Sequence, residues 1–196
     1  GALGIDYKGR LVGAERTCSD PGGKPDQCHE DAKLEVLSPT REVLASKFGD
    51  KPFWRMGEVV LDSKGGAYFS DDSGTYFVNA AKAVSLVADK TVRTNGMMLS
   101  RDEKTLYLTN GKTVVAFDVQ PDGTTKNQRD FATLPANGDG MCIDAEGRLY
   151  VTAGDAGIEV IGPDGKHVGL IPLPRSASSV AFSGPNKKVL YAKGRS

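Results

Sequence analysis

The chain has 196 residues, and its 25 basic and 25 acidic side chains give a formal net charge of zero. This balance offers no electrostatic basis for binding nucleic acid or an anionic membrane surface, so neither is an expected partner. No apolar run approaches ~18 residues, so no transmembrane helix is predicted, and no signal peptide is recognised at the start. The 24 glycines and 10 prolines predict many turns in one β-rich domain spanning residues 1–196.

Five segments of the chain align with one another, and each reads as a short apolar strand, a polar turn and a second strand. In chain order they are LGIDYKGRLVGAE from Leu3, VVLDSKGGAYFSD from Val59, MMLSRDEKTLYLTN from Met97, MCIDAEGRLYVTA from Met141 and VAFSGPNKKVLYAK from Val180. After a longer first interval they recur about every 40 residues, close to the repeat length of propeller blades. The repeat predicts an all-β propeller, with a β-sandwich as the alternative.

The turn chemistry supports these hairpins. Asp or Ser at the entry of a turn can accept a hydrogen bond from the backbone ahead, and Gly supplies a positive φ, as in Asp144 to Gly147. Further strand pairs lie between the hairpins, for example IEVIGPDGKHVGLIPL, which gives four strands per repeat. The chain starts within a repeat and ends after a second strand. We therefore expect about four full blades plus fragments, with self-association as one way to close the ring.

A polar loop insertion at about 17–32 carries two of the three cysteines, Cys18 and Cys28. These two are disulfide candidates. A Cys18–Cys28 bond would indicate a periplasmic or secreted protein, because disulfides rarely persist in the cytosol. Free thiols, and a cytoplasmic protein, are the alternative. A metal site at Cys28-His29 is disfavoured, because zinc needs three or four ligands at set spacings.

The segments before each innermost strand of a propeller face its central channel, so their polar residues are candidate site residues. In two of these segments a side chain with an oxygen that can bind a metal stands directly before a glycine, in Asn95-Gly96 and in Asp139-Gly140. Carboxylate and amide oxygens suit Ca²⁺ or another hard cation. Asn-Gly and Asp-Gly are also common turn dipeptides, so a purely structural role is the alternative.

Several of these stretches together resemble the family of senescence marker protein, gluconolactonase and luciferin-regenerating enzyme. The matching stretches are GEVVLDSKGGAYFSD, RTNGMMLSRDEKTLYL, VVAFDVQPDGT, GDGMCIDAEGRLYVT and SSVAFSGPNKKVLY, which fall in family order. The resemblance implies a six-bladed propeller with one divalent metal in its central channel. It also implies that the protein hydrolyses lactones of sugar acids. It also implies that Asn95 and Asp139 are metal ligands and that Asp139 is the general base.

The chain departs from the family pattern at other channel positions. The blade that carries the family's first metal ligand, a Glu in an E-G-P motif, is absent. The N-D-L motif reads Gly57-Glu58-Val59, which leaves Glu58 either as a substrate-binding residue or as a turn residue, and the late P-T-N-V-A-F motif has Ser179 in place of Asn. A non-catalytic binding or scaffold propeller with an eroded metal site is therefore the rival hypothesis.

The reaction that the resemblance implies is metal-assisted hydrolysis of a small-molecule lactone. Ca²⁺ is the first expectation for the cation, with Zn²⁺ and Mg²⁺ as alternatives. Asp139 would accept a proton from the attacking water. No G-x-S-x-G motif is present, which disfavours a serine hydrolase.

Overall fold

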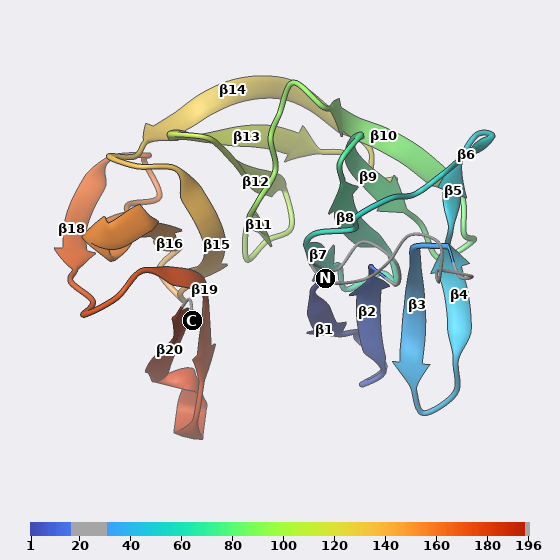
Figure 1. The fold of residues 1–196 in the computed structure, drawn as a ribbon, viewed down its shortest axis with the longest axis horizontal. Helices are drawn as coiled ribbons and strands as arrows, with labels where there is room; N and C mark the ends of the chain where they lie inside the picture. Colours follow the sequence, from blue (N-terminus) through green and yellow to red (C-terminus); the bar gives the residue numbers. More distant parts are fainter. Residues whose placement is uncertain (17–30, 195–196) are drawn as a thin grey trace, which may run out of the picture. The chain divides into compact units, whose positions relative to one another are not determined.

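The structure, a computed structural model, describes residues 1–16 and 31–194 (Figure 1). Within them the strands form four four-stranded antiparallel sheets and two two-stranded ones. The helical elements described are two short 3₁₀ turns, η2 (Gly154–Ala156) and η3 (Pro185–Lys187). None of the described helices is long and apolar enough to cross a membrane. The prediction of an all-β fold is confirmed, whereas Cys18 and Cys28 lie outside the described residues and their pairing stays a prediction.

The chain packs as two compact units, which we describe separately. Unit 1 comprises Gly1–Val92 and Gln120–Thr124. Its first sheet is β1 (Leu3–Ile5), β2 (Leu11–Glu15), β3 (Lys33–Ser38) and β4 (Glu42–Ala45), and its second is β7 (Val59–Leu61), β8 (Ala67–Asp71), β9 (Gly74–Val78) and β10 (Val84–Asp89); β5 (Lys47–Phe48) and β6 (Lys51–Pro52) form a hairpin between them. In both large sheets the strands follow chain order, and the two first strands, β1 and β7, contact each other.

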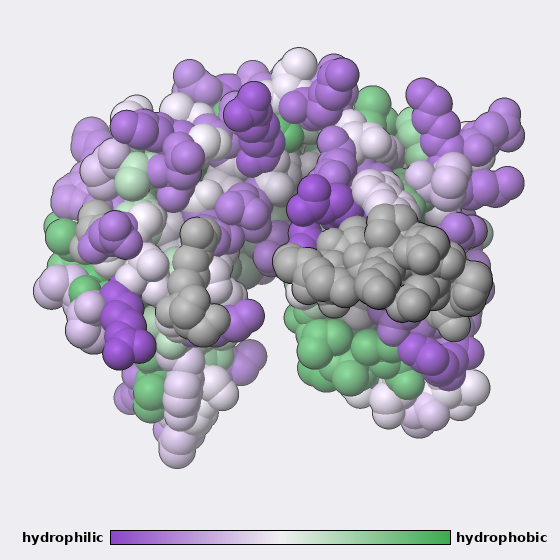
Figure 2. Space-filling model, viewed as in Figure 1, coloured by the Kyte–Doolittle hydropathy of each residue, from purple (hydrophilic) through white to green (hydrophobic). Residues whose placement is uncertain are grey.

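The core of unit 1 lies between these two sheets. Its centre is aromatic: the ring of Phe53 lies 5.0 Å from those of Phe69 and Tyr76, and all three side chains are buried. Aromatic pairs at this separation stabilise a core beyond the area that they bury. Leu3 and Ile5 of β1 stay exposed, and Figure 2 shows a hydrophobic patch over β1 and β2.

Unit 2 comprises Arg93–Val119 and Thr125–Ser196. Its first sheet is β11 (Met97–Leu99), β12 (Thr105–Asn110), β13 (Thr113–Val119) and β14 (Thr125–Thr133), its second is β15 (Gly138–Ile143), β16 (Leu149–Ala153), β17 (Ile158–Ile161) and β18 (His167–Ile171), and its last is the pair β19 (Ala177–Ser183) and β20 (Val189–Gly194). The first strands are again neighbours, β11 with β15 and β15 with β19. The outermost strand β14 is largely exposed, and Figure 2 shows mainly hydrophilic side chains along it.

The four-strand repeat expected from the sequence is therefore present in four sheets. In each of them the first strand is an edge strand that lies against the first strand of a neighbouring sheet, as in a propeller. The entry to each first strand is the position where the sequence predicts functional residues.

The turns between the first and second strands show why these hairpins close. Asp144 Oδ1 accepts hydrogen bonds from the backbone N–H groups of Glu146 and Arg148, both at 2.9 Å, and its Oδ2 accepts one from Arg148 Nε at 2.6 Å. Asp6 makes the equivalent three contacts, to Lys8 N, Arg10 N and Arg10 Nε. Burial opposes ionisation of both carboxyls, but these hydrogen bonds outweigh it and hold the pKa of each below its ordinary value.

These two carboxyls should make the stability of the protein depend on acid pH. A carboxyl whose pKa is lower in the folded than in the unfolded chain stabilises the fold above the unfolded pKa, near 3.9 for Asp, and loses that contribution as the pH falls through the folded pKa. We expect the double variant D6N/D144N to lose less stability than the wild type when the pH is lowered from about 5 to 3. Urea unfolding at each pH measures this, with exposed D50N as the control. An unchanged pH slope in the double variant would contradict the assignment.

Candidate functional site

The candidate site of unit 2 is formed where β11, β15 and β19 begin. Strand pairing defines which residues are equivalent in the three sheets: Met97 pairs with Leu108, Met141 with Val151, and Val180 with Ala192. Counting back two residues from Met97, Met141 and Val180 gives one equivalent position in each sheet. That position is occupied by Asn95, Asp139 and Ser178.

A buried hydroxyl fixes the first of these segments. Thr109 of β12 is fully buried, and its Oγ1 accepts hydrogen bonds from the backbone N–H groups of Asn95 at 3.2 Å and Gly96 at 2.7 Å. The Thr109 N–H donates in turn to the Gly96 carbonyl at 3.0 Å. The backbone that carries Asn95 is thus held from the neighbouring strand, and its exposed side chain is left at the surface.

The same device recurs in two other sheets. Thr152 of β16, also fully buried, donates from Oγ1 to the Gly140 carbonyl at 3.1 Å. In unit 1 the buried Ser70 of β8 accepts at Oγ from the Glu58 N–H at 3.1 Å. We call Ser70, Thr109 and Thr152 the hydroxyl clamps.

The sequence reasoning missed these hydroxyl clamps, although a signal was available. Each clamp is the third residue of a Tyr-x-Ser or Tyr-x-Thr triplet in the second strand of a repeat. The triplets are Tyr68-Phe69-Ser70, Tyr107-Leu108-Thr109 and Tyr150-Val151-Thr152.

Two glycines bring the entries of these strands together. An ideal Cβ built on Gly96 would lie 2.0 Å from the Asp139 carbonyl oxygen, and one on Gly140 would lie 2.8 Å from the Ser178 carbonyl oxygen. Only a residue without a side chain allows such contact between backbones. Asp139 and Gly140 belong to strand β15, so Asp139-Gly140 is not a turn dipeptide, whereas Asn95-Gly96 lies in a bend just before β11.

The structure therefore brings Asn95 and Asp139 to equivalent positions on adjoining strand entries, with Ser178 next in line. Asn95 is exposed and Asp139 is half-buried. Within the described residues, no three His, Cys, Asp or Glu side chains are grouped so that they could hold a metal ion. The donors at this site are one carboxylate, one amide and one hydroxyl, all oxygen atoms, which fit a hard cation such as Ca²⁺ or Mg²⁺ better than Zn²⁺.

Glu58 belongs to unit 1 and is half-buried. The Glu58 N–H donates a hydrogen bond to the Ser70 hydroxyl, just as the Gly96 N–H donates one to the Thr109 hydroxyl. In addition, Val59 pairs with Phe69, the residue before Ser70. Glu58 is thus the counterpart of Gly96, and the counterpart of Asn95 is Gly57. The N-D-L motif, which reads Gly57-Glu58-Val59, likewise places Gly57 at its Asn position. The substrate-binding role of Glu58 stays a prediction.

Two other side chains of unit 2 with reactive groups, Cys142 and His167, are explained by burial or by a local ion pair and are not needed as catalytic residues. Burial raises the pKa of the Cys142 thiol to about 12, so this cysteine is not a thiolate nucleophile at neutral pH. His167 lies on the outer strand β18 and pairs with the buried Glu159 across a hairpin, at 2.6 Å between Nε2 and Oε2. Asp139 remains the candidate for proton transfer at the strand entries.

Sheet topology and the polar strand entries define a propeller-type all-β protein. Residues 27–193 match the model of the SMP-30/Gluconolactonase/LRE-like region. Since this match covers more than half of the chain, the protein belongs to that family. The resemblance inferred from the sequence is confirmed.

Individual relatives extend this picture. The chain is 33% identical over 134 residues to lactonase drp35 of Staphylococcus saprophyticus, an alignment that covers 60% of this chain and 41% of that protein. It is 25% identical over 172 residues to a gluconolactonase of Zymomonas mobilis, covering 71% and 47%. The chain thus spans less than half the length of these two relatives.

Solved structures share the fold. A gluconolactonase from Xanthomonas campestris superposes with a TM-score of 0.80 at 22% identity, covering 98% of this chain and 68% of that one. A calcium-binding protein, regucalcin, from Agrobacterium tumefaciens superposes with a TM-score of 0.75 at 17% identity, covering 98% and 66%. At this level of identity the likeness establishes the fold.

Replacing the clamp hydroxyl should destabilise the fold at this site. In Thr109→Val the buried N–H of Gly96 loses its acceptor, and an unsatisfied buried donor costs about 1–3 kcal/mol. We expect Thr109→Val to lower the free energy of unfolding by this amount, and Thr109→Ser, which keeps the hydroxyl, to lower it less. Urea denaturation measures both, with Thr133→Val at an exposed position of β14 as the control. Equal stability of Thr109→Val and the wild type would show that the clamp is dispensable.

Proposed function

We propose that this protein hydrolyses lactones of sugar acids with the help of a divalent cation, at a site that includes Asn95 and Asp139. Membership of the family and the lactonase and gluconolactonase relatives support the reaction class. The observation that carries the assignment to these residues is the contact of Gly96 with the Asp139 backbone, because it makes an amide and a carboxylate neighbours at the entries of two first strands.

The roles follow from the chemistry of the side chains. Hydrolysis requires that a water oxygen attack the lactone carbonyl carbon, that the water lose a proton, and that the ring C–O bond break so that the ring oxygen gains one. Asp139 is the base that accepts the proton of the attacking water, and its half-buried position limits competition from bulk solvent. The amide of Asn95 and the hydroxyl of Ser178 can hydrogen-bond the hydroxyl groups of a sugar lactone.

A bound divalent cation would polarise the lactone carbonyl. Asn95 and Asp139 are the residues of this chain proposed to hold it. Their oxygen donors favour Ca²⁺, with Mg²⁺ as the next candidate, and a solved relative is described as a calcium-binding protein. Since Ca²⁺ takes six to eight oxygen ligands, the two side chains supply a minority of the coordination shell.

One observation favours a second candidate, a propeller that binds ligands without catalysis. The position equivalent to Asn95 in the second sheet of unit 1 is Gly57, which has no side chain to bind a metal or a substrate, and the position equivalent to Asp139 in the last sheet is Ser178. Two of four equivalent positions therefore lack a carboxylate or an amide. Metal analysis of the purified protein and a lactone hydrolysis assay with and without a chelator separate the two candidates.

Asp139→Asn should abolish lactone hydrolysis in the active form of the protein. An amide cannot accept the proton, and positioned general-base catalysis is typically worth ~10²–10⁴ in rate. Asn95→Ala should be milder, because water can replace a neutral ligand. The rate of lactone opening at saturating Ca²⁺ measures both effects.

The control for this comparison is Asp164→Asn, in an exposed turn of the same sheet as Asp139. Thermal melting of each variant distinguishes a loss of activity from a loss of the folded structure. Full metal-dependent activity in a normally folded Asp139→Asn protein would overturn the assignment of Asp139 as the base.

A further inference from the structure

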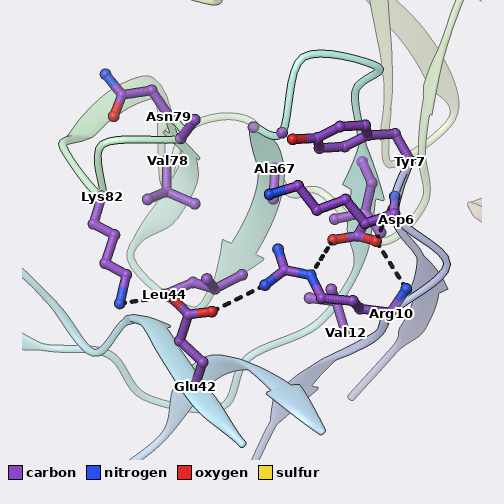
Figure 3. Close-up of a pocket in the computed structure, with 15 residues that line it drawn as sticks. Asp6, Tyr7, Arg10, Val12, Glu42, Leu44, Ala67, Val78, Asn79 and Lys82 are labelled. Carbon is purple, nitrogen blue, oxygen red and sulfur yellow. Dashed lines mark hydrogen bonds and ion pairs between the residues drawn. The ribbon is translucent and has the colours of Figure 1, made fainter. Parts of the chain in front are cut away.

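Unit 1 contains a pocket that plays no part in the site described above. It has a volume of about 170 Å³ and lies between the two large sheets of the unit, beside the turn after β1 and the turn after β9 (Figure 3). Its apolar lining includes Val12, Leu44 and Val78, and its polar lining includes three cationic side chains, Lys8, Arg10 and Lys82. We call it the Lys82 pocket.

The cations of the Lys82 pocket outnumber its anions. Asp6 and Glu42 are the acidic residues of the lining, so the formal charge of its ionised side chains is +1. The Lys82 ammonium, followed by Arg10, holds the pKa of the Glu42 carboxyl below its ordinary value, so Glu42 is ionised at neutral pH. The pocket therefore retains one positive charge without a matching carboxylate.

The carboxylate oxygens of the pocket are already engaged. Glu42 Oε2 accepts from Arg10 Nη1 at 2.9 Å, and Glu42 Oε1 pairs with Lys82 Nζ at 3.0 Å. Asp6 Oδ2 accepts from Arg10 Nε at 2.7 Å, and Asp6 Oδ1 accepts two backbone N–H groups. Figure 3 shows Arg10 between these two carboxylates. Its remaining nitrogen, Nη2, has no acceptor among the described residues, so the pocket offers more N–H donors than acceptors.

The turn after β9 carries Lys82 into the lining of the pocket. Lys82 has a φ of +63° and ends a four-residue turn in which its N–H donates to the Asn79 carbonyl at 2.8 Å. A glycine stands at the corresponding place in some turns of this chain, such as Gly9 and Gly147, whereas Glu103 and Lys187 hold it in two others, with a φ of +56° and +52°. The turn thus accepts a charged residue as well as a glycine, and at Lys82 the residue that it holds lines the pocket.

The ion pair with Glu42 does not by itself account for the lysine. The side chains of Lys82 and Glu42 are 48% and 43% exposed, and ion pairs at such exposure contribute little to stability.

We propose that the Lys82 pocket binds a small organic anion through its carboxylate or phosphate group. Lys82 Nζ and Arg10 Nη2 donate to the anionic group, and the apolar side chains of Val12, Leu44 and Val78 contact a short carbon skeleton. The volume restricts the ligand to a molecule of a few carbon atoms.

The variant Lys82→Gly tests this proposal without endangering the fold. It removes the ammonium and places the residue best suited to a positive φ in the turn, so the protein should fold at least as stably as the wild type. Glu103→Gly is the matched control, because Glu103 has a φ of +56° at the same place in the turn that begins at Ser100 and does not line the pocket.

Binding of inorganic phosphate, acetate and butyrate is measured by titration calorimetry at constant ionic strength. We expect saturable binding of phosphate or of the carboxylates by the wild type and Glu103→Gly, weakened about tenfold or more in Lys82→Gly. Tighter binding of butyrate than of acetate would identify a carboxylate with a carbon chain, and binding of phosphate alone would identify a phosphate. Equal affinities in all three proteins, or no saturable binding by the wild type, would overturn the proposal.

Discussion

The close approach of neighbouring first strands is the constraint on which the candidate site depends. Gly96 lies directly against the Asp139 backbone, and Gly140 lies against Ser178. Any side chain at either glycine would have to displace backbone rather than a flexible side chain. The identities of these two residues are therefore set by packing, and this packing makes Asn95 and Asp139 neighbours.

The repeat provides the frame, and function is proposed where the repeat varies. Each equivalent strand entry is positioned by the same kind of backbone pairing, yet its residue differs: Gly57, Asn95, Asp139 or Ser178. The turns vary at one position too, which is glycine in several of them and Lys82, Glu103 or Lys187 in others, and Lys82 is the one of these three that borders the Lys82 pocket. In both cases the regular positions build the sheets, and the functions that we propose lie at the positions that vary.

The sequence predicted the hairpins well because their cause is local. Aspartate at the turn entry and glycine at a positive φ act within a few residues, and the structure shows Asp6 and Asp144 making the expected contacts. The residues at the strand entries were harder to predict. Glycine is required at position 96 because the backbone of Asp139, more than forty residues further along the chain, lies against it. The local sequence does not distinguish a glycine that is needed for a positive φ in a turn from one that is needed because a neighbouring strand packs against it.

The hydroxyl clamps illustrate the same limit. Thr109 and Thr152 look like ordinary strand residues until pairing shows which backbone groups their hydroxyls meet. The single domain over residues 1–196, the number of blades in the whole protein and the disulfide at Cys18 and Cys28 stay predictions. Each depends on relations between parts of the chain that local patterns do not encode.

The most direct measurement is the free energy of unfolding of Gly96→Ala compared with Gly169→Ala. A Cβ at Gly96 would meet the Asp139 backbone, whereas one at Gly169 on the outer strand β18 has nothing within 4 Å. We predict that Gly96→Ala loses about 1–3 kcal/mol or more and that Gly169→Ala stays within about 0.5 kcal/mol of the wild type. Equal stability of the two variants would contradict the claim that backbone contact at Gly96 brings Asn95 and Asp139 together.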